Sequence, residues 1–200
     1  MIRRLGQNAS LAALVTFAVL GLSSAASAHV GDHSHMSFAE GLRHPLMGLD
    51  HVLAMVAVGL WASQLSRRAL WLLPLTFPLL MAVGAALGFG GVALPWVEIG
   101  ITGSVLVFGA MVALALRPGL AVSVPLVGLF ALLHGYAHGV ELPANASALG
   151  YGAGFIAATL MLHAVGIAIG VMTNRVSVRF VARSAGGAIA VVGVVLLTMP

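Results

Sequence analysis

The sequence of 200 residues contains no cysteine and very little charge. The absence of cysteine excludes disulfides, thiolate metal sites and redox dithiols, so metal chemistry would have to use His, carboxylate, Met or backbone ligands. Only 7% of the residues are charged and 60% are hydrophobic, whereas about a quarter of a soluble domain is charged. The composition therefore predicts an integral membrane protein.

Several motifs with known chemistry are also missing. The sequence has no glycine-rich phosphate loop, no H-E-x-x-H zinc motif and no G-x-S-x-G nucleophile elbow. We therefore expect no ATP hydrolysis by the chain itself, no enzyme activity and no prosthetic group, and no ATPase subunit is evident. Nine Arg against five acidic residues would suggest nucleic acid in a soluble chain. In a membrane protein their placement matters more, and we expect no nucleic-acid partner.

Residues 1–28 are typical of a secretory signal peptide. Two arginines are followed by an apolar core at 11–22 and an A-x-A-type cleavage site at 26–28. The alternative is an uncleaved first span, which the shortness of the apolar core disfavours. Cleavage would leave residues 29–200 as the mature membrane domain, with His29 at its N-terminus on the outer side of the membrane.

Apolar segments fill the rest of the chain, each close to the ~20 residues that cross a ~30 Å hydrocarbon core. They cover residues 46–64, 69–89, 99–116, 120–139, 149–172 and 180–199. The predicted fold class is all-α, a polytopic membrane helix bundle with six transmembrane helices after a cleaved signal peptide. All connections are short, so we expect no soluble domain.

The arginines predict the orientation of these spans. With the mature N-terminus outside, only Arg43 of the mature arginines lies in an outer segment. The others fall in cytoplasmic loops: Arg67, Arg68, Arg117, Arg175, Arg179 and Arg183. This positive-inside pattern indicates a multi-pass protein of the bacterial inner membrane whose mature N-terminus is periplasmic.

One group of metal-capable side chains lies at the outer end of the first span. His44 and His51 are seven residues apart, so one continuous helix would place them on nearly the same face, with Asp50 about 100° from His51. Pro45 suits the first turn of such a helix, where its missing N–H is no loss. Gly48 would leave room on that face for an ion or a neighbouring backbone.

A second group lies at the outer end of the fourth span. His134 and His138 are four residues apart and Glu141 follows three later, so the three share one face if the helix persists to Glu141. Pro143 supplies the stop, because it disfavours helix at the residue before it.

The two spans thus bring imidazoles and carboxylates to one level of the membrane. Ionisable groups inside a bilayer are costly and indicate a functional site; the alternative is a structural hydrogen-bond network between helices. Imidazole with carboxylate and no thiolate favours a first-row divalent ion such as Ni, Co, Cu or Zn, without naming which.

Two other sets of histidines each have two interpretations. His163 would lie ~21 Å deep in the fifth span, either as a second position on an inward path or as a structural donor to a carbonyl. His29, His33 and His35 form a His/Asp-rich tract, which either captures divalent metal loosely or is an incidental polar tail.

The two clusters resemble the signature motifs of the HupE/UreJ family of nickel/cobalt permeases. The resemblance rests on His44-Pro45-x-x-Gly48-x-Asp50-His51, followed by Leu53-Ala54-Met55, and on His134-Gly135-x-Ala137-His138-Gly139-x-Glu141. It implies a secondary permease that moves Ni²⁺, or in some members Co²⁺, inward from the periplasm to supply hydrogenase or urease. Position 136 is Tyr, so that motif offers no third histidine.

The predicted partners are therefore a transiently bound divalent metal ion and the lipid bilayer, with a homo-oligomer possible. The predicted metal-binding residues are His44, Asp50, His51, His134, His138, Glu141, His163, His29, His33 and His35. Three alternatives from other classes stay open: a bis-His cytochrome with haem b, a zinc-dependent intramembrane hydrolase, and a metal sensor or chaperone that binds ions without moving them.

Overall fold

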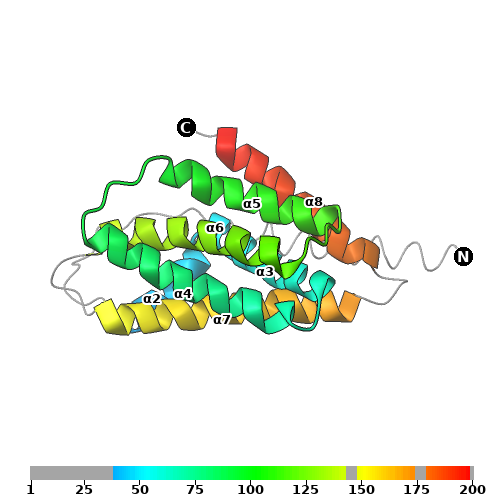
Figure 1. Cartoon of the computed structure of the whole chain (residues 1–200), viewed down its shortest axis with the longest axis horizontal. Helices are drawn as coiled ribbons and strands as arrows, with labels where there is room; N and C mark the ends of the chain where they lie inside the picture. Colours follow the sequence, from blue (N-terminus) through cyan, green and yellow to red (C-terminus); the bar gives the residue numbers. More distant parts are fainter. Residues whose placement is uncertain (1–37, 143–147, 174–178, 199–200) are drawn as a thin grey trace, which may run out of the picture.

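The computed structural model describes residues 38–142, 148–173 and 179–198, in which all regular elements are α-helices (Figure 1). In chain order they are α2 (Phe38–Met47), α3 (Leu49–Leu65), α4 (Ala69–Phe89), α5 (Val97–Ala113), α6 (Leu120–Glu141), α7 (Ala148–Thr173) and α8 (Arg179–Thr198). Helices satisfy their backbone polar groups internally, as a hydrocarbon environment requires. The all-α prediction is confirmed, whereas the predicted signal peptide and the N-terminal histidines lie outside the described residues.

The number of membrane spans is confirmed only in part. Four helices, α4, α6, α7 and α8, are each long and apolar enough to cross a membrane. The pair α2 and α3 meets the same criterion together but is bent by 85°, and α5 is shorter, with 17 residues. The described part of the chain therefore supports four spans, or five with the bent pair, and six spans stay a prediction.

The first predicted span is not one continuous helix. Pro45 lies inside α2 rather than in the first turn of the span. The break falls at Gly48, whose extended backbone (φ −90°, ψ 117°) forms the N-cap of α3. A Cβ at Gly48 would come within 2.8 Å of the Asp50 carboxylate and 2.9 Å of the His51 ring. The glycine thus leaves room for these two side chains, whereas the sequence predicted room for an ion or a neighbouring backbone.

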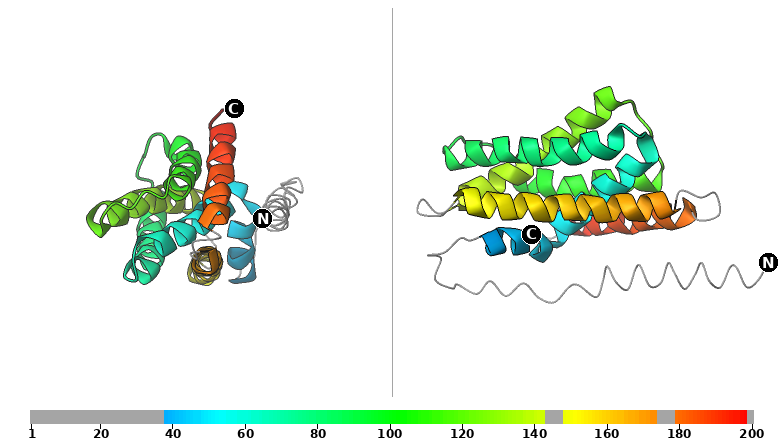
Figure 2. Two further views of the ribbon diagram at one scale, coloured as in Figure 1. Left: turned by 90° about the vertical axis from the view of Figure 1, so that its right-hand side faces the viewer. Right: turned by 90° about the horizontal axis from the view of Figure 1, so that it is seen from below.

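The helix α3 lies at the centre of the bundle, with ten of its 17 residues buried. It packs against α4, α5, α7 and α8, while α2 lies along α7 (Figure 2). At the far end of α3, Trp61 Nε1 donates to the Leu116 carbonyl (2.9 Å) and Gln64 Nε2 donates to the Val112 carbonyl (3.3 Å). The two bonds tie this end of α3 to the last turn of α5 and to the segment that directly follows it. They anchor the helix that carries His51.

Glycines allow the closest helix pairs to form. On α4, a Cβ at Gly84 would collide with the Leu132 carbonyl of α6; on α6, a Cβ at Gly135 would collide with the Met81 carbonyl of α4. Small residues at such contacts let helix backbones approach, which is the main source of van der Waals attraction between helices in lipid. The approach of α4 to α6 helps to position the His-bearing end of α6.

We expect Gly84→Ala to destabilise the bundle by about 1–3 kcal/mol, because the added methyl overpacks the α4–α6 contact. Gly103→Ala is the matched control, since a Cβ there meets nothing within 4 Å. It should be neutral or stabilising by about 0.5–1 kcal/mol, because alanine is the better helix former. Unfolding of the purified protein in detergent, followed by circular dichroism, measures both. Equal effects of the two substitutions would contradict the packing argument.

Candidate metal centre

Three helices bring the predicted side chains of both clusters to one end of the bundle. They are His44 from α2, Asp50 and His51 from α3, and His134, His138 and Glu141 from α6. The His138 ring centroid lies 4.7 Å from that of His44 and 4.8 Å from that of His51. His134 lies beside His51, with ring centroids 5.1 Å apart. We call these six residues the outer cluster.

The Asp50 carboxylate orients the imidazole of His51. Its Oδ1 accepts the His51 backbone N–H (2.9 Å) and lies 2.8 Å from His51 Nδ1. Because an ionised carboxylate only accepts hydrogen bonds, Nδ1 carries the ring proton and Nε2 is left with its lone pair. That Nε2 lies 2.6 Å from Nε2 of His138. An acceptor that fixes the tautomer in this way is the usual partner of a metal-binding histidine.

A backbone carbonyl orients His134 in the same way. His134 Nδ1 lies 2.8 Å from the Phe130 carbonyl oxygen, one turn earlier on α6. Because a carbonyl only accepts, Nδ1 is again the donor, and the lone pair is on Nε2. That Nε2 is buried and has no hydrogen-bond partner. Two imidazoles of the cluster are therefore held in one tautomer: His51 Nε2 accepts from His138, and His134 Nε2 has no partner.

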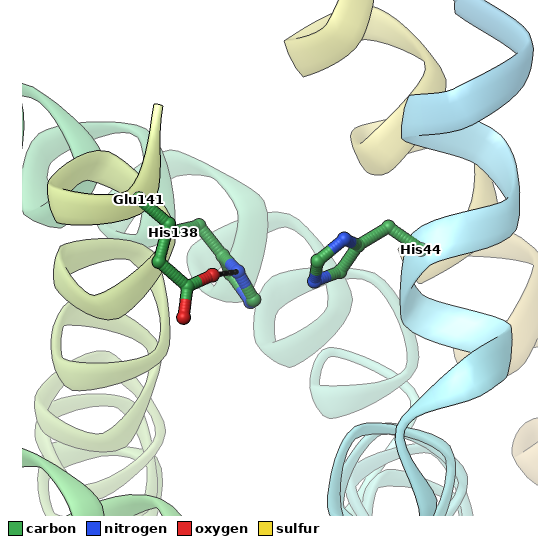
Figure 3. Close-up of side chains that lie close together, drawn as sticks. All are labelled: His44, His138 and Glu141. Carbon is green, nitrogen blue, oxygen red and sulfur yellow. Dashed lines mark ion pairs between the residues drawn. The ribbon is translucent and has the colours of Figure 1, made fainter. Parts of the chain in front are cut away.

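Three residues converge at the mouth of the cluster: His44, His138 and Glu141 (Figure 3). One ligand atom of each lies within 4.8 Å of the others, and the His138 Nδ1–Glu141 Oε2 ion pair measures 3.8 Å. Ligands of one ion at ~2.0–2.2 Å lie roughly 3–4 Å apart, so small side-chain movements would close this set on a divalent cation.

Exposure decreases inward through the outer cluster. The Glu141 side chain is 67% exposed and that of His138 is 9% exposed, while His134 is fully buried. An ion that moved from Glu141 to His134 would thus exchange water for imidazole nitrogen. Beside the cluster, an apolar cavity of about 560 Å³ between α4, α6 and α7 is lined by His138 and Tyr151 among apolar side chains.

The sequence correctly predicted that the six residues of the outer cluster lie together, but its argument for His44 and His51 was wrong. The helix α6 does reach Glu141, so its three residues are spaced along one face as expected. His44 and His51 do not share a helix face, because the bend at Gly48 puts them on different helices; their ring centroids are 6.3 Å apart. His163 lies on α7 and is not among the six, while His29, His33 and His35 lie outside the described residues.

Sequence reasoning missed the contribution of α7. The Phe155 ring lies against His44, His51 and His138, with centroid distances of 5.7, 6.3 and 4.6 Å. Its place near the outer end of the fifth span is readable from the sequence, but its contact partners are not. The sequence also left open the role of Tyr136, which lies away from the metal-capable residues.

The hydroxyl of Tyr136 holds the connection between α4 and α5. It donates to the Val92 carbonyl (2.6 Å) and accepts the Leu94 N–H (3.1 Å). The side chain between His134 and His138 therefore has a structural task, and its identity as tyrosine removes no ligand from the outer cluster.

A bundle of apolar helices with oriented imidazoles and carboxylates at one end defines a polytopic membrane protein with a candidate metal centre. The chain belongs to the HupE/UreJ family, whose model, described as HupE / UreJ protein, matches residues 17–196. It is also 48% identical over 182 residues to Protein HupE of Rhizobium leguminosarum bv. viciae, which covers 91% of this chain and 95% of that protein. No solved structure matches the chain. The predicted family is confirmed.

If the outer cluster binds metal, His138→Ala should lower the affinity for Ni²⁺ by at least about tenfold, as is typical of losses at a metal site. Tyr136→Phe should leave that affinity unchanged, because the Tyr136 hydroxyl bonds only to the loop backbone. Equilibrium dialysis of the detergent-purified variants against Ni²⁺ provides the comparison. A similar loss in both variants would argue against the assignment.

Proposed function

We propose that this protein is a secondary permease that moves a divalent transition metal ion, Ni²⁺ or Co²⁺, from the periplasm to the cytoplasm. The ion would supply nickel enzymes such as hydrogenase or urease. The observation that carries the proposal is the outer cluster, in which oriented imidazoles from α3 and α6 meet: His51 Nε2 lies 2.6 Å from His138 Nε2, and His134 Nε2 is left without a partner. Membership of the HupE/UreJ family supports it.

The gradient of exposure in the outer cluster suits capture and dehydration of an ion. The exposed Glu141 carboxylate would attract the hydrated cation, and the more buried His44 and His138 would replace part of its water. His51 and His134 lie deeper and offer nitrogen ligands already held in one tautomer. Such preorganisation lowers the cost of ordering the ligands when the ion binds. His29, His33 and His35 would collect the ion first.

The proposed direction of transport follows from charge. The outer cluster lies at the end of the bundle opposite to Arg67, Arg68 and Arg183, whose side the positive-inside rule assigns to the cytoplasm. A negative-inside potential is worth ~2.3 kcal/mol per charge per 100 mV. The ion would therefore move inward along its gradient and this potential, without ATP.

The packing of the rings favours an ion over a haem. Bis-His ligation places the porphyrin between its two axial nitrogens, but the Nε2 atoms of His51 and His138 lie 2.6 Å apart. The Phe155 ring covers the same histidines from α7. For the zinc-hydrolase alternative, the sequence shows no H-E-x-x-H motif to supply a general base. A haem Soret band in the absorbance spectrum of the purified protein would contradict the permease proposal.

Proteoliposomes that contain the protein should take up Ni²⁺ or Co²⁺ faster than Zn²⁺ or Cu²⁺ when a negative-inside potential is imposed. Asp50→Asn should slow uptake by about 10–100-fold, because it removes the charge that orients a ligand histidine, and His51→Ala should slow it at least as much. Binding of the ion without uptake would indicate a sensor or chaperone instead. Equal uptake rates in wild type and both variants would refute the proposed site.

The absence of native cysteine allows the proposed orientation to be tested by single-cysteine labelling. Ala93→Cys, between α4 and α5, should react in intact spheroplasts with a membrane-impermeant maleimide. Gly119→Cys, between α5 and α6, should react only after lysis. Both positions are exposed, and a Cβ at Gly119 meets nothing within 4 Å. The reverse pattern of labelling would mean that the cluster faces the cytoplasm.

A further inference from the structure

Unpartnered polar atoms in the described residues continue inward from the outer cluster. The buried side-chain atoms without a hydrogen-bond partner are Gln64 Oε1, His134 Nε2, His138 Nδ1, Thr159 Oγ1 and both ring nitrogens of His163. More than about 90% of buried polar groups in proteins are paired, so each exception calls for an explanation. The outer cluster accounts for the two α6 histidines but not for Thr159 and His163.

Thr159 and His163 extend the α7 face that covers the outer cluster. Phe155, Thr159 and His163 follow one another at intervals of four residues, or ~6 Å along the helix axis per step. Phe155 contacts three histidines of the outer cluster. Thr159 and His163 are both fully buried. The same face of α7 therefore leads from the outer cluster to a second, deeper imidazole.

The ring of Phe77 from α4 joins the two levels. Its centroid lies 5.6 Å from that of His134 and 5.2 Å from that of His163. Phe77 is itself fully buried. The deepest imidazole of the outer cluster and the imidazole of α7 thus lie against the same aromatic side chain.

The position of His163 is not explained by hydrogen bonding. A structural histidine in a membrane helix would donate to a carbonyl, as His134 does to Phe130, yet both ring nitrogens of His163 are unpartnered. The α7 backbone is held tightly at this level, because a Cβ at Gly59 of α3 would collide with the His163 carbonyl. A buried imidazole that forms no bond in a rigid surrounding costs free energy without stabilising the fold.

We propose that His163, with Thr159 one turn before it, forms an inner binding position for the same divalent cation, one step inward from the outer cluster. The inference rests on the proposed permease function. The ion would leave His134, pass the Phe77 ring and bind an unprotonated ring nitrogen of His163, with the Thr159 hydroxyl as an oxygen ligand. Gln64 Oε1, farther along α3, is the next unpartnered acceptor toward the cytoplasmic end.

His163→Leu separates this role from a structural one. Leucine replaces an unpaired polar group by an apolar one, so the unfolding temperature in detergent should stay the same or rise. Ni²⁺ affinity of the outer cluster, from equilibrium dialysis, should not change. Initial Ni²⁺ uptake into proteoliposomes should nevertheless fall by about tenfold or more, as for other metal sites. Thr159→Val should cause a smaller fall. Met161→Leu, at an exposed position of α7, is the control and should transport like wild type.

Each other result counts against the inner position. Uptake by His163→Leu at the wild-type rate would overturn it. So would a fall in uptake that is matched by a fall in unfolding temperature or in outer-cluster affinity, because that pattern indicates a structural role. If wild-type protein binds Ni²⁺ but transports none, the permease proposal itself fails and the inner position fails with it. The wild-type measurement distinguishes this case from the first two.

Discussion

The interaction between Asp50 and His51 is the one on which the outer cluster depends. A single carboxylate oxygen binds both the backbone N–H and the ring Nδ1 of His51 at the first turn of α3. A negative side chain is favourable at a helix N-terminus, so the same contact stabilises the restart of the helix after Gly48 and points Nε2 of His51 toward His138 of α6. The bend then brings His44 back onto the same site from α2. Local capping and ligand orientation are thus one interaction.

Tight packing of the bundle makes this arrangement stable around unpaired polar atoms. In lipid, helix association relies on close van der Waals contact rather than on burial from water, and the contacts of α4 with α6 are made across glycines. The end of α3 distant from the cluster is anchored to α5 by Trp61 and Gln64. The buried imidazoles are therefore supported by a scaffold that does not need them. Functional sites typically carry such a free-energy cost locally, here that of unpaired buried polar atoms, and packing elsewhere in the fold offsets it.

Much of the site could be predicted from the sequence because the relevant signals are local. Hydropathy located the helices, and the spacing of His134, His138 and Glu141 correctly placed them on one face of α6. The same periodicity argument was wrong for His44 and His51, since it assumed a continuous helix. The extended backbone of Gly48 and the 85° bend overrode that assumption. Gly48, two residues before Asp50, is a signal of a helix start that the hydropathy of the segment obscures.

By itself, the sequence determined the helical class, the family, the absence of thiolate chemistry and the distribution of arginines that predicts orientation. These properties follow from composition and short-range spacing, which do not depend on how helices pair. Only the tertiary structure decided that His51 meets His138, 87 residues later in the chain, and that Phe155 covers them. It alone showed that His163 is buried without a partner. Such contacts depend on which helix faces meet, and in this chain that is decided by glycine packing and by one bend.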